Sequence, residues 1–415
     1  MKTPFDPSQS VRDVQHFGEE GGVVPVIDVA ATSTFLKPDD MERVFRGEMQ
    51  GCYLYSRHSN PSVTAFGKKM AAIEGMPAAL GVASGMAAIS CAVEQIFLNA
   101  SGPATAGAAS SLVGGHIVSS KVVYGGTYAL FANVLPKRGI TTTFVDPNDL
   151  AAIEKAITPE TKLIYTETMS NPLLAISHLK ALSELAKKKN VKLVVDNTFT
   201  PVLISAGRHG ADVVVYSCTK YISGASDLIA GAIVSDQAFI DSLIDINSGL
   251  VMLTGPVMDP RIAHELYLRL DHLPLRMQAH SKSAAFLAAK MSEAGVKVIY
   301  PGLKDHPQHA RMKELMNPEY GFGGMLTVEC GSMKQAMKLA GRLQEEKFGL
   351  YAVSLGFSRT LISCPSSSTS SEIPEEEQKL MGLNPGLLRL SIGFVGNDEV
   401  MAERFLHCYR EVVQG

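Results

Sequence analysis

Short runs of apolar, β-branched residues that alternate with helix-like segments constrain the fold of this chain most strongly. Three such runs occupy residues 162–165, 191–195 and 212–216. Helix-like segments are interleaved with them at 65–74, 150–156 and 179–189. Because the runs are continuously apolar, they predict strands buried on both faces, and therefore an α/β fold with a mostly parallel sheet flanked by helices. A ligand site is expected beyond the carboxyl ends of these strands.

The sequence divides into three parts. Residues 1–60 are polar and interrupted by Gly and Pro, which predicts an N-terminal arm rather than a domain. We expect a large α/β domain over 61–272 and a smaller C-terminal α/β domain over 273–415, where the helix-like segments are longer and the loops richer in Gly. Residues 101–115 are rich in Ala, Gly and Ser and lack periodicity, which predicts a flexible surface insertion.

Charge and cysteine content exclude several classes of protein. The 38 Lys and Arg residues against 41 Asp and Glu give a net charge of -3, which argues against a nucleic acid or an anionic membrane held by charge. The six cysteines are scattered without zinc-like spacing, which predicts free thiols in a reducing compartment and no metal site. Because we find neither a secretory signal nor an apolar run near the roughly 18 to 20 residues that span a bilayer, we expect a soluble cytoplasmic protein.

Two predicted strands end close to residues of opposite charge. The strand at 191–195 runs directly into Asp196, and the strand at 212–216 is followed by Lys220. A carboxylate or an ammonium group at the end of a buried strand is costly unless it has a partner. Both costs fall if the two residues share a cofactor, with Lys220 as an imine and Asp196 facing a protonated pyridine nitrogen. This pairing is the one expected of pyridoxal 5′-phosphate (PLP).

The same cofactor needs a site for its phosphate. Residues 84–86, Ser-Gly-Met, open a helix with small side chains, the type of helix start where backbone N–H groups bind phosphate. Ser217 and Thr219 add hydroxyl donors, and the guanidinium of Arg57 is a candidate counter-ion. Each signal alone is more often an ordinary helix start, a strand-end cap or a solvated lysine. Their order along the chain, phosphate loop, acidic strand end and lysine strand end, favours a PLP site.

With these residues in place, the chain resembles the Cys/Met-metabolism family of PLP-dependent enzymes. The family includes cystathionine γ-synthase, cystathionine γ-lyase, O-acetylhomoserine sulfhydrylase and methionine γ-lyase, and the chain is most similar to the plant-type methionine γ-lyases. The resemblance runs from about residue 18 to residue 395 and implies the aspartate-aminotransferase-like fold, PLP fold type I. The motifs that carry it are at 55–61, 84–86, 124–127, 167–172, 196–198, 217–224, 353–356 and 388–393.

The resemblance also implies roles for individual residues. Lys220 would carry PLP as a Schiff base and move protons, and Asp196 would keep the pyridine nitrogen protonated. Tyr124 would stack on the ring and act as an acid or base. Arg389 would bind the substrate carboxylate, and Ser354, Asn171 and Tyr124 would assist it. The residues expected to bind the cofactor are Tyr55, Ser56, Arg57, Ser84, Gly85, Met86, Tyr124, Asn171, Asp196, Thr198, Ser217, Thr219 and Lys220.

Two features remain without such a role. Glu167 is expected near the active site. Gly126 stands where many bacterial methionine γ-lyases carry a cysteine, and glycine at this position is usual in the cystathionine enzymes and in the plant-type lyases.

The sequence leaves three hypotheses for the function. The first is γ-elimination on methionine or a related thioether, giving 2-oxobutanoate, ammonia and a thiol. The second is γ-replacement on an activated homoserine ester, as in cystathionine γ-synthase or O-acetylhomoserine sulfhydrylase, with cystathionine γ-lyase as a further alternative. The third is an inert scaffold on the same fold, which the joint presence of Lys220, Asp196, Tyr124 and Arg389 disfavours.

The resemblance predicts the assembly of the protein as well. In the family, Tyr55 and Arg57 of the arm reach the phosphate in the neighbouring subunit, so a single chain would have an incomplete site. We therefore expect a homotetramer of two catalytic dimers with a small amino-acid substrate. No nucleic-acid or membrane partner is expected.

Overall fold

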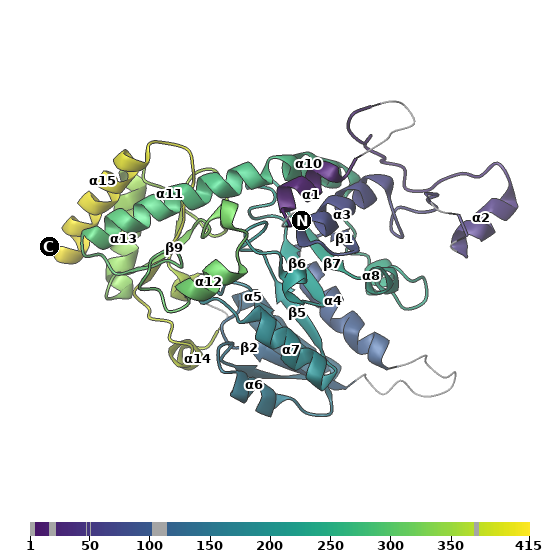
Figure 1. Ribbon diagram of the computed structural model, residues 1–415, viewed down its shortest axis with the longest axis horizontal. Helices are drawn as coiled ribbons and strands as arrows, with labels where there is room; N and C mark the ends of the chain where they lie inside the picture. Colours follow the sequence, from purple (N-terminus) through teal and green to yellow (C-terminus); the bar gives the residue numbers. More distant parts are fainter. Residues whose placement is uncertain (1–4, 16–21, 47, 50, 102–113, 369–372) are drawn as a thin grey trace.

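A computed structural model describes residues 5–15, 22–46, 48–49, 51–101, 114–368 and 373–415. Most of the insertion predicted at 101–115 lies outside these residues. The described chain is elongated, with a large sheet in the middle, a second sheet toward the C-terminus and an N-terminal arm at the opposite end (Figure 1). None of its described helices is both long and apolar enough to cross a membrane.

The large sheet has seven strands in the order β1-β7-β6-β5-β4-β2-β3. Neighbouring strands from β6 to β3 pair in parallel, and β7 pairs antiparallel with both β1 and β6. The carboxyl ends of all strands except β7 therefore meet at one edge. This mixed, mostly parallel sheet confirms the predicted fold class. The strands are β1 Ala78–Val82, β2 Gly115–Ser120, β3 Ile140–Val145, β4 Thr161–Glu167, β5 Lys192–Asp196, β6 Val213–Ser217 and β7 Gly231–Ser235.

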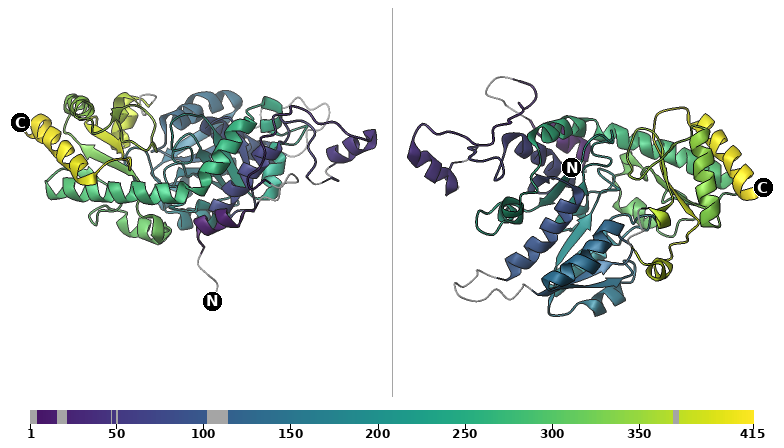
Figure 2. Two further views of the ribbon diagram at one scale, coloured as in Figure 1. Left: turned by 90° about the horizontal axis from the view of Figure 1, so that it is seen from above. Right: turned by 180° about the vertical axis from the view of Figure 1, so that it is seen from behind.

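Apolar side chains on both faces explain why the central strands are continuously hydrophobic. In β5, Leu193 and Val195 join the core on one face of the sheet, and Val194 joins the core on the other. Helices α3, α6, α7 and α10 supply the first core, and α4, α5, α8 and α9 supply the second. The two sets cover opposite faces of the sheet (Figure 2). Their bounds are α3 Pro61–Glu74, α4 Gly85–Ala100, α5 Gly125–Ala129, α6 Leu150–Ala156, α7 Leu179–Lys189, α8 Gln237–Leu243, α9 Leu250–Thr254 and α10 Pro260–Asp271.

The helix predicted at 65–74 begins one turn earlier, at Pro61. Asn60 caps it, because its Oδ1 accepts the N–H groups of Ser62 at 2.9 Å and Val63 at 3.4 Å. Asparagine followed by proline is a strong helix start, because the proline nitrogen has no hydrogen to leave unsatisfied. The apolar periodicity alone does not reveal this first turn, where Val63 is the one residue that joins the core.

The second sheet has five strands in the order β10-β11-β12-β9-β8 and packs against α11, α13 and α15. We propose that this smaller domain begins at Leu273, where α11 starts. Its elements are α11 Leu273–Glu293, β8 Val298–Ile299, α12 His309–Leu315, β9 Met325–Glu329, α13 Met333–Glu345, β10 Leu350–Tyr351, β11 Leu361–Ser363, α14 Glu375–Leu380, β12 Leu387–Ser391 and α15 Asp398–Tyr409.

The described part of residues 1–60, the predicted arm, contains helices α1 and α2. Helix α1, Pro7–Asp13, packs on the body of the protein, where Val11 is buried and Asp6 accepts a hydrogen bond of 2.6 Å from Tyr320 Oη. The described residues that follow project outward and carry α2, Pro38–Phe45 (Figure 1). Several apolar side chains are exposed there, including Leu36.

A buried polar cluster lies behind the carboxyl end of β5. Glu74, at the end of α3, accepts hydrogen bonds from Asn197 Nδ2 at 2.8 Å, from Tyr216 Oη and from the Gly207 N–H at 2.9 Å. Burial raises the pKa of Glu74 to about 7, and these donors lower it in part. Because Asn197 directly follows Asp196, the cluster fixes the backbone from which the predicted cofactor-binding residue projects.

Replacing Glu74 tests this cluster. At pH 8 the Glu74 side chain is mostly ionised, and its two carboxylate oxygens accept all three hydrogen bonds. In Glu74→Gln an NH₂ group replaces one of these oxygens, so it faces a donor and cannot accept its hydrogen bond. We expect a loss of about 2 kcal/mol or more in the free energy of unfolding, measured by urea denaturation. Glu184→Gln, on the exposed side of α7, is the matched control and should change it by less than about 0.5 kcal/mol. Equal stabilities of the two variants would contradict the network.

Candidate active site

A cavity of about 280 Å³ lies beyond the carboxyl edge of the large sheet and is closed on one side by the small domain. Strands β1, β4, β5 and β6 end at it, and residues near β11 and β12 line its other side. The structure brings most of the predicted site residues together here. They are Ser84, Gly85, Met86, Tyr124, Asn171, Asp196, Thr198, Ser217, Thr219, Lys220, Ser354 and Arg389.

Three predicted residues do not line this cavity. Tyr55, Ser56 and Arg57 belong to the arm, where the Arg57 guanidinium lies over the Tyr55 ring and donates a hydrogen bond of 2.6 Å to the carbonyl of Met252. Ser56 Oγ donates a hydrogen bond to the carbonyl of Ala30. Within one chain these contacts hold the arm residues to each other and to α9, and leave them outside the site.

The start of α4 is shaped to receive an anion. Ser84 caps the helix, because its Oγ accepts the N–H of Ala87 at 3.0 Å. A Cβ on Gly85 would lie 2.7 Å from Ser217 Cβ, so only glycine lets the helix start approach the end of β6 this closely. The first N–H groups of a helix lack acceptors within the helix and favour negative charge. Ser217 and Thr219 line the same cavity, and the Thr219 hydroxyl accepts the N–H of Ala230 at 3.1 Å.

Asp196 ends β5 at the same edge. Its Oδ1 accepts the N–H of Thr198 at 2.9 Å, and Tyr165 Oη donates to Oδ2 at 3.5 Å. Burial raises its pKa, whereas the hydrogen bonds from Thr198 and Tyr165 lower it. No described lysine or arginine forms an ion pair with it. Asp196 is therefore a carboxyl group that a cationic ligand would stabilise in its ionised form.

Lys220 follows β6 and points toward the small domain. Its Nζ donates a hydrogen bond of 2.8 Å to Ser354 Oγ. Burial, with a smaller contribution from the positive charge of Arg389, lowers the pKa of Lys220 to about 8. A substantial fraction of the amine is thus neutral near physiological pH, which is the form that attacks a carbonyl group.

Arg389, on β12, is a buried cation that meets no carboxylate in the described chain. Its Nη1 donates to Asn171 Oδ1 at 3.0 Å and its Nη2 to the Ser354 carbonyl at 2.9 Å, while Nε has no acceptor. Burial lowers its pKa to about 10. A buried guanidinium with an unfilled donor favours an anionic ligand, and a planar carboxylate fits its fork.

Ser354 holds both cations in an unusual backbone conformation. Its φ is +91°, in the left-handed region that residues other than glycine rarely adopt. Such a residue costs of order 1 to 3 kcal/mol and persists only where its surroundings enforce it. Here its hydroxyl accepts from Lys220 and its carbonyl from Arg389.

Gly126 makes room for Tyr124. A Cβ at position 126 would lie 2.6 Å from Cε1 of the Tyr124 ring. A larger residue at this position therefore requires a different placement of the ring, which gives the glycine noted in the sequence a local role.

Glu167 lines the cavity, as expected from the sequence, and further residues there had no predicted place in the site. Glu167 lies at the end of β4 and accepts the N–H of Tyr124 at 2.6 Å. The others are apolar, and all but Ile229 lie within three residues of a predicted site residue, so proximity to the motifs was the available signal for them. They are Ile89, Met169, Phe199, Ile229 and Leu355.

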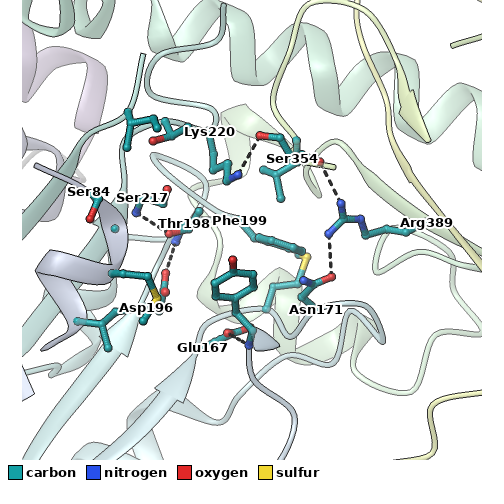
Figure 3. A pocket seen from close by; sticks show the side chains of 18 residues that line it. Ser84, Glu167, Asn171, Asp196, Thr198, Phe199, Ser217, Lys220, Ser354 and Arg389 are labelled. Carbon is teal, nitrogen blue, oxygen red and sulfur yellow. Dashed lines mark hydrogen bonds between the residues drawn. The ribbon is translucent and has the colours of Figure 1, made fainter. Parts of the chain in front are cut away.

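The residues present fit PLP. A phosphate fits the start of α4, an aldehyde fits the partly neutral amine of Lys220, and a protonated ring nitrogen fits Asp196. Figure 3 shows Ser84, Ser217 and Asp196 on one side of the cavity and Arg389 and Asn171 on the other, with Lys220 facing Ser354. The cavity can therefore bind a phosphorylated, cationic ring at one end and an amino-acid carboxylate at the other. No described cluster of three or more His, Cys, Asp or Glu residues could hold a metal ion.

Comparisons with known proteins agree with this geometry. A family model described as "Cys/Met metabolism PLP-dependent enzyme" matches residues 9–403. Methionine gamma-lyase of Arabidopsis thaliana is 43% identical over 401 residues, which are 95% of this chain and 88% of that protein.

Two solved structures extend the comparison. The crystal structure of a protein from Campylobacter jejuni, provisionally assigned as an O-acetylhomoserine (thiol)-lyase, carries a pyridoxyl-lysine monophosphate at its position 205. It is similar with a TM-score of 0.86 and 26% identity, over 98% of this chain and 100% of that one. Cystathionine gamma-lyase of Lactobacillus plantarum, complexed with L-serine, has a TM-score of 0.83 and 30% identity, with 99% of each chain covered.

The lowered pKa of Lys220 gives a prediction for the ligand-free protein. The amine reacts with an aldehyde only when neutral, so the rate of imine formation with PLP should rise with pH to a plateau with a midpoint near 8. An unperturbed lysine would give about 10.4. Stopped-flow absorbance measures the rate, and Lys220→Ala should abolish it. Arg389→Met removes a neighbouring positive charge and should move the midpoint to higher pH. A wild-type midpoint above about 10 would refute this account of the site.

Proposed function

The chain belongs to the Cys/Met metabolism family of PLP-dependent enzymes, and we propose that within this family it catalyses γ-elimination on methionine or a closely related thioether. The products would be a thiol, ammonia and 2-oxobutanoate. PLP is the cofactor of the family. The binding and proton-transfer steps of this reaction can be assigned to the chain's own residues.

Separate groups would hold the separate parts of the cofactor. Lys220 would carry it covalently, and Asp196 would face its ring nitrogen. The helix start at Ser84, Gly85 and Met86, with Ser217 and Thr219, would hold its phosphate. When bound, the cofactor supplies an electron sink for the electron pair left on the substrate Cα.

Protein groups would then move the protons. Arg389 and Asn171 bind the substrate carboxylate and so place Cα near the amine of Lys220. Once the substrate amine has freed it from the cofactor, the Lys220 amine takes the Cα proton, and a second proton must leave Cβ before the Cγ–S bond breaks. Tyr124, a residue that lines the cavity and is 40% exposed, donates a proton to the departing sulfur.

The observation that supports methionine best is where the charges lie. The ionisable groups of acidic and basic residues on the described wall belong to Lys220, Arg389, Asp196 and Glu167, and binding of cofactor and substrate carboxylate engages the first three. Cystathionine carries a further ammonium and carboxylate beyond its sulfur, and burying them without partners is costly. A methyl thioether fits a wall without charge. The apolar side chains of this wall are Met86, Ile89, Met169, Phe199, Ile229 and Leu355.

Relatives support both the lyase and its rival. The similarity to methionine gamma-lyase of Arabidopsis thaliana favours elimination. The fold similarity to the protein assigned as an O-acetylhomoserine (thiol)-lyase keeps γ-replacement as the second candidate. The two reactions share their early proton transfers and differ in whether water or a thiol completes them.

Substrate competition separates these candidates. Purified protein is incubated with methionine, cystathionine or O-acetylhomoserine, each with and without added thiol, and 2-oxobutanoate and thioether products are quantified. We expect 2-oxobutanoate from methionine without thiol, and kcat/KM for methionine at least about tenfold above that for cystathionine, because one unpaired buried charge costs more than this factor. Product formation only when thiol is supplied would overturn the lyase assignment in favour of replacement.

We further propose that two chains form each complete site and that two such pairs form a homotetramer. The arm projects from the body, exposes apolar side chains such as Leu36, and keeps Tyr55 and Arg57 outside the cavity of their own chain. A second copy would bury the apolar residues and bring a guanidinium to the phosphate end of the site.

Subunit complementation tests this assembly. Arg57→Ala and Lys220→Ala should each be nearly inactive alone. In a hybrid dimer of the two variants, one site combines both defects and the other has neither, so refolding them together should restore a measurable fraction of wild-type activity. Light scattering checks the tetramer. Failure of complementation while both variants still assemble would show that each chain forms its site alone.

A further inference from the structure

Glu167 lies in the middle of the site, although the sequence assigned it no role there. It is the last residue of β4, is buried, and pairs in register with Asp196 on β5. The side chains of paired residues on adjacent parallel strands lie on the same face of the sheet. Two carboxyl groups therefore stand side by side at the cavity, and both residues are visible on its wall in Figure 3.

The contacts of Glu167 reach both halves of the site. Its Oε1 accepts the backbone N–H of Tyr124 at 2.6 Å, at the N-terminus of α5. The backbone N–H of Asn171 also lies near this carboxyl group and lowers its pKa. The Asn171 side chain in turn holds Arg389 at 3.0 Å. A single carboxyl group thus connects the tyrosine that would act as acid to the arginine that would bind the substrate.

The surroundings of Glu167 favour its neutral form. Asp196 lies beside it, Tyr165 reaches the same region from β4, and no described lysine, arginine or histidine forms an ion pair with it. Burial, together with the charge of Asp196, raises its pKa well above the usual range. Two adjacent buried carboxyls do not both ionise, and a cationic ring nitrogen would stabilise the charge on Asp196.

We propose that Glu167 is a positioning residue that, as a neutral carboxyl group, holds the backbones of Tyr124 and Asn171 and leaves the single negative charge of the pair to Asp196. The inference rests on the proposed roles of Tyr124 and Arg389. It goes beyond them because Glu167 is assigned an effect on both ends of the substrate without touching the reacting atoms.

Three substitutions separate the two parts of this inference. Glu167→Gln keeps the size, the neutrality and a carbonyl oxygen for the Tyr124 N–H. Glu167→Asp can ionise but is shorter by one methylene group, and withdraws the acceptor from both N–H groups. Glu167→Ala removes the acceptor. Glu184→Gln on exposed α7 is the control for handling.

Two readouts use the cofactor-loaded protein and need no turnover. The first is the pH titration of the visible cofactor band. Glu167→Gln should leave its midpoint within about 0.3 pH unit of wild type, whereas loss of an ionised neighbour would lower the midpoint by about one unit or more. The second is the visible circular dichroism per bound cofactor, which reports how rigidly the ring and its aromatic neighbour are held. It should be preserved in Glu167→Gln and fall at least about twofold in Glu167→Asp and Glu167→Ala as the Tyr124 backbone loosens.

A third readout tests the arginine side. L-norleucine has the shape of methionine but no leaving group, and NMR follows exchange of its Cα proton in D₂O. The kcat/KM for Cα-proton exchange should fall at least about tenfold in Glu167→Asp and Glu167→Ala, partly because KM rises. In Glu167→Gln it should stay within about threefold of wild type. Because this exchange does not require methionine elimination, the test of Glu167 remains valid even if the proposed function is wrong.

Two outcomes would overturn the inference. A shifted titration midpoint in Glu167→Gln would show that the native side chain is ionised. Unchanged circular dichroism in Glu167→Ala, with cofactor content equal to wild type, would show that Tyr124 does not depend on it.

Discussion

The site depends on the cost of burying charge at the edge of a sheet. Lys220 and Arg389 are cations without a carboxylate partner in the described chain, and Asp196 and Glu167 are acids without a cation. They lie in one cavity but do not pair with each other, so the protein retains an electrostatic cost that a suitable ligand relieves. PLP and an amino acid would supply the missing partners: a cationic ring nitrogen, an aldehyde that removes the charge of the lysine, and a carboxylate.

The fold makes this separation possible. Parallel strands place Glu167, Asp196 and Ser217 at one edge, and the start of α4 completes the acidic and phosphate side of the cavity. Arg389 comes from the small domain, because it lies on β12, whereas Lys220 follows β6 of the large sheet. A contact between the domains fixes its distance from the large sheet: Thr327 on β9 donates a hydrogen bond of 2.7 Å to the carbonyl of Pro172, next to Asn171. Neither domain alone contains both halves of the site.

The sequence alone predicts those site residues that come at or just after the ends of buried strands. Asp196 and Lys220 could be identified from their position after buried strands, because an unpaired charge there requires a partner. Arg389 could be assigned only by family resemblance, since β12 lies far along the chain and no local pattern connects it to the large sheet. The contacts of Glu167 could not be predicted, because they depend on the register of β4 with β5 and on backbone N–H groups. The left-handed Ser354 carries no sequence signal, since residues of its type seldom adopt that conformation.

Ser354 shows how the two ends of the site are coupled. Its hydroxyl and its carbonyl group hold different cations, and at φ of +91° this residue binds Lys220 and Arg389 together. When Lys220 turns toward a cofactor, the hydroxyl loses its donor, and when a carboxylate binds Arg389, it competes with the carbonyl. Both events therefore change the interactions that hold one strained residue in place. The strain is of order 1 to 3 kcal/mol, comparable to one or two hydrogen bonds. Binding at one end of the site should therefore change binding at the other end without any large movement of the domains.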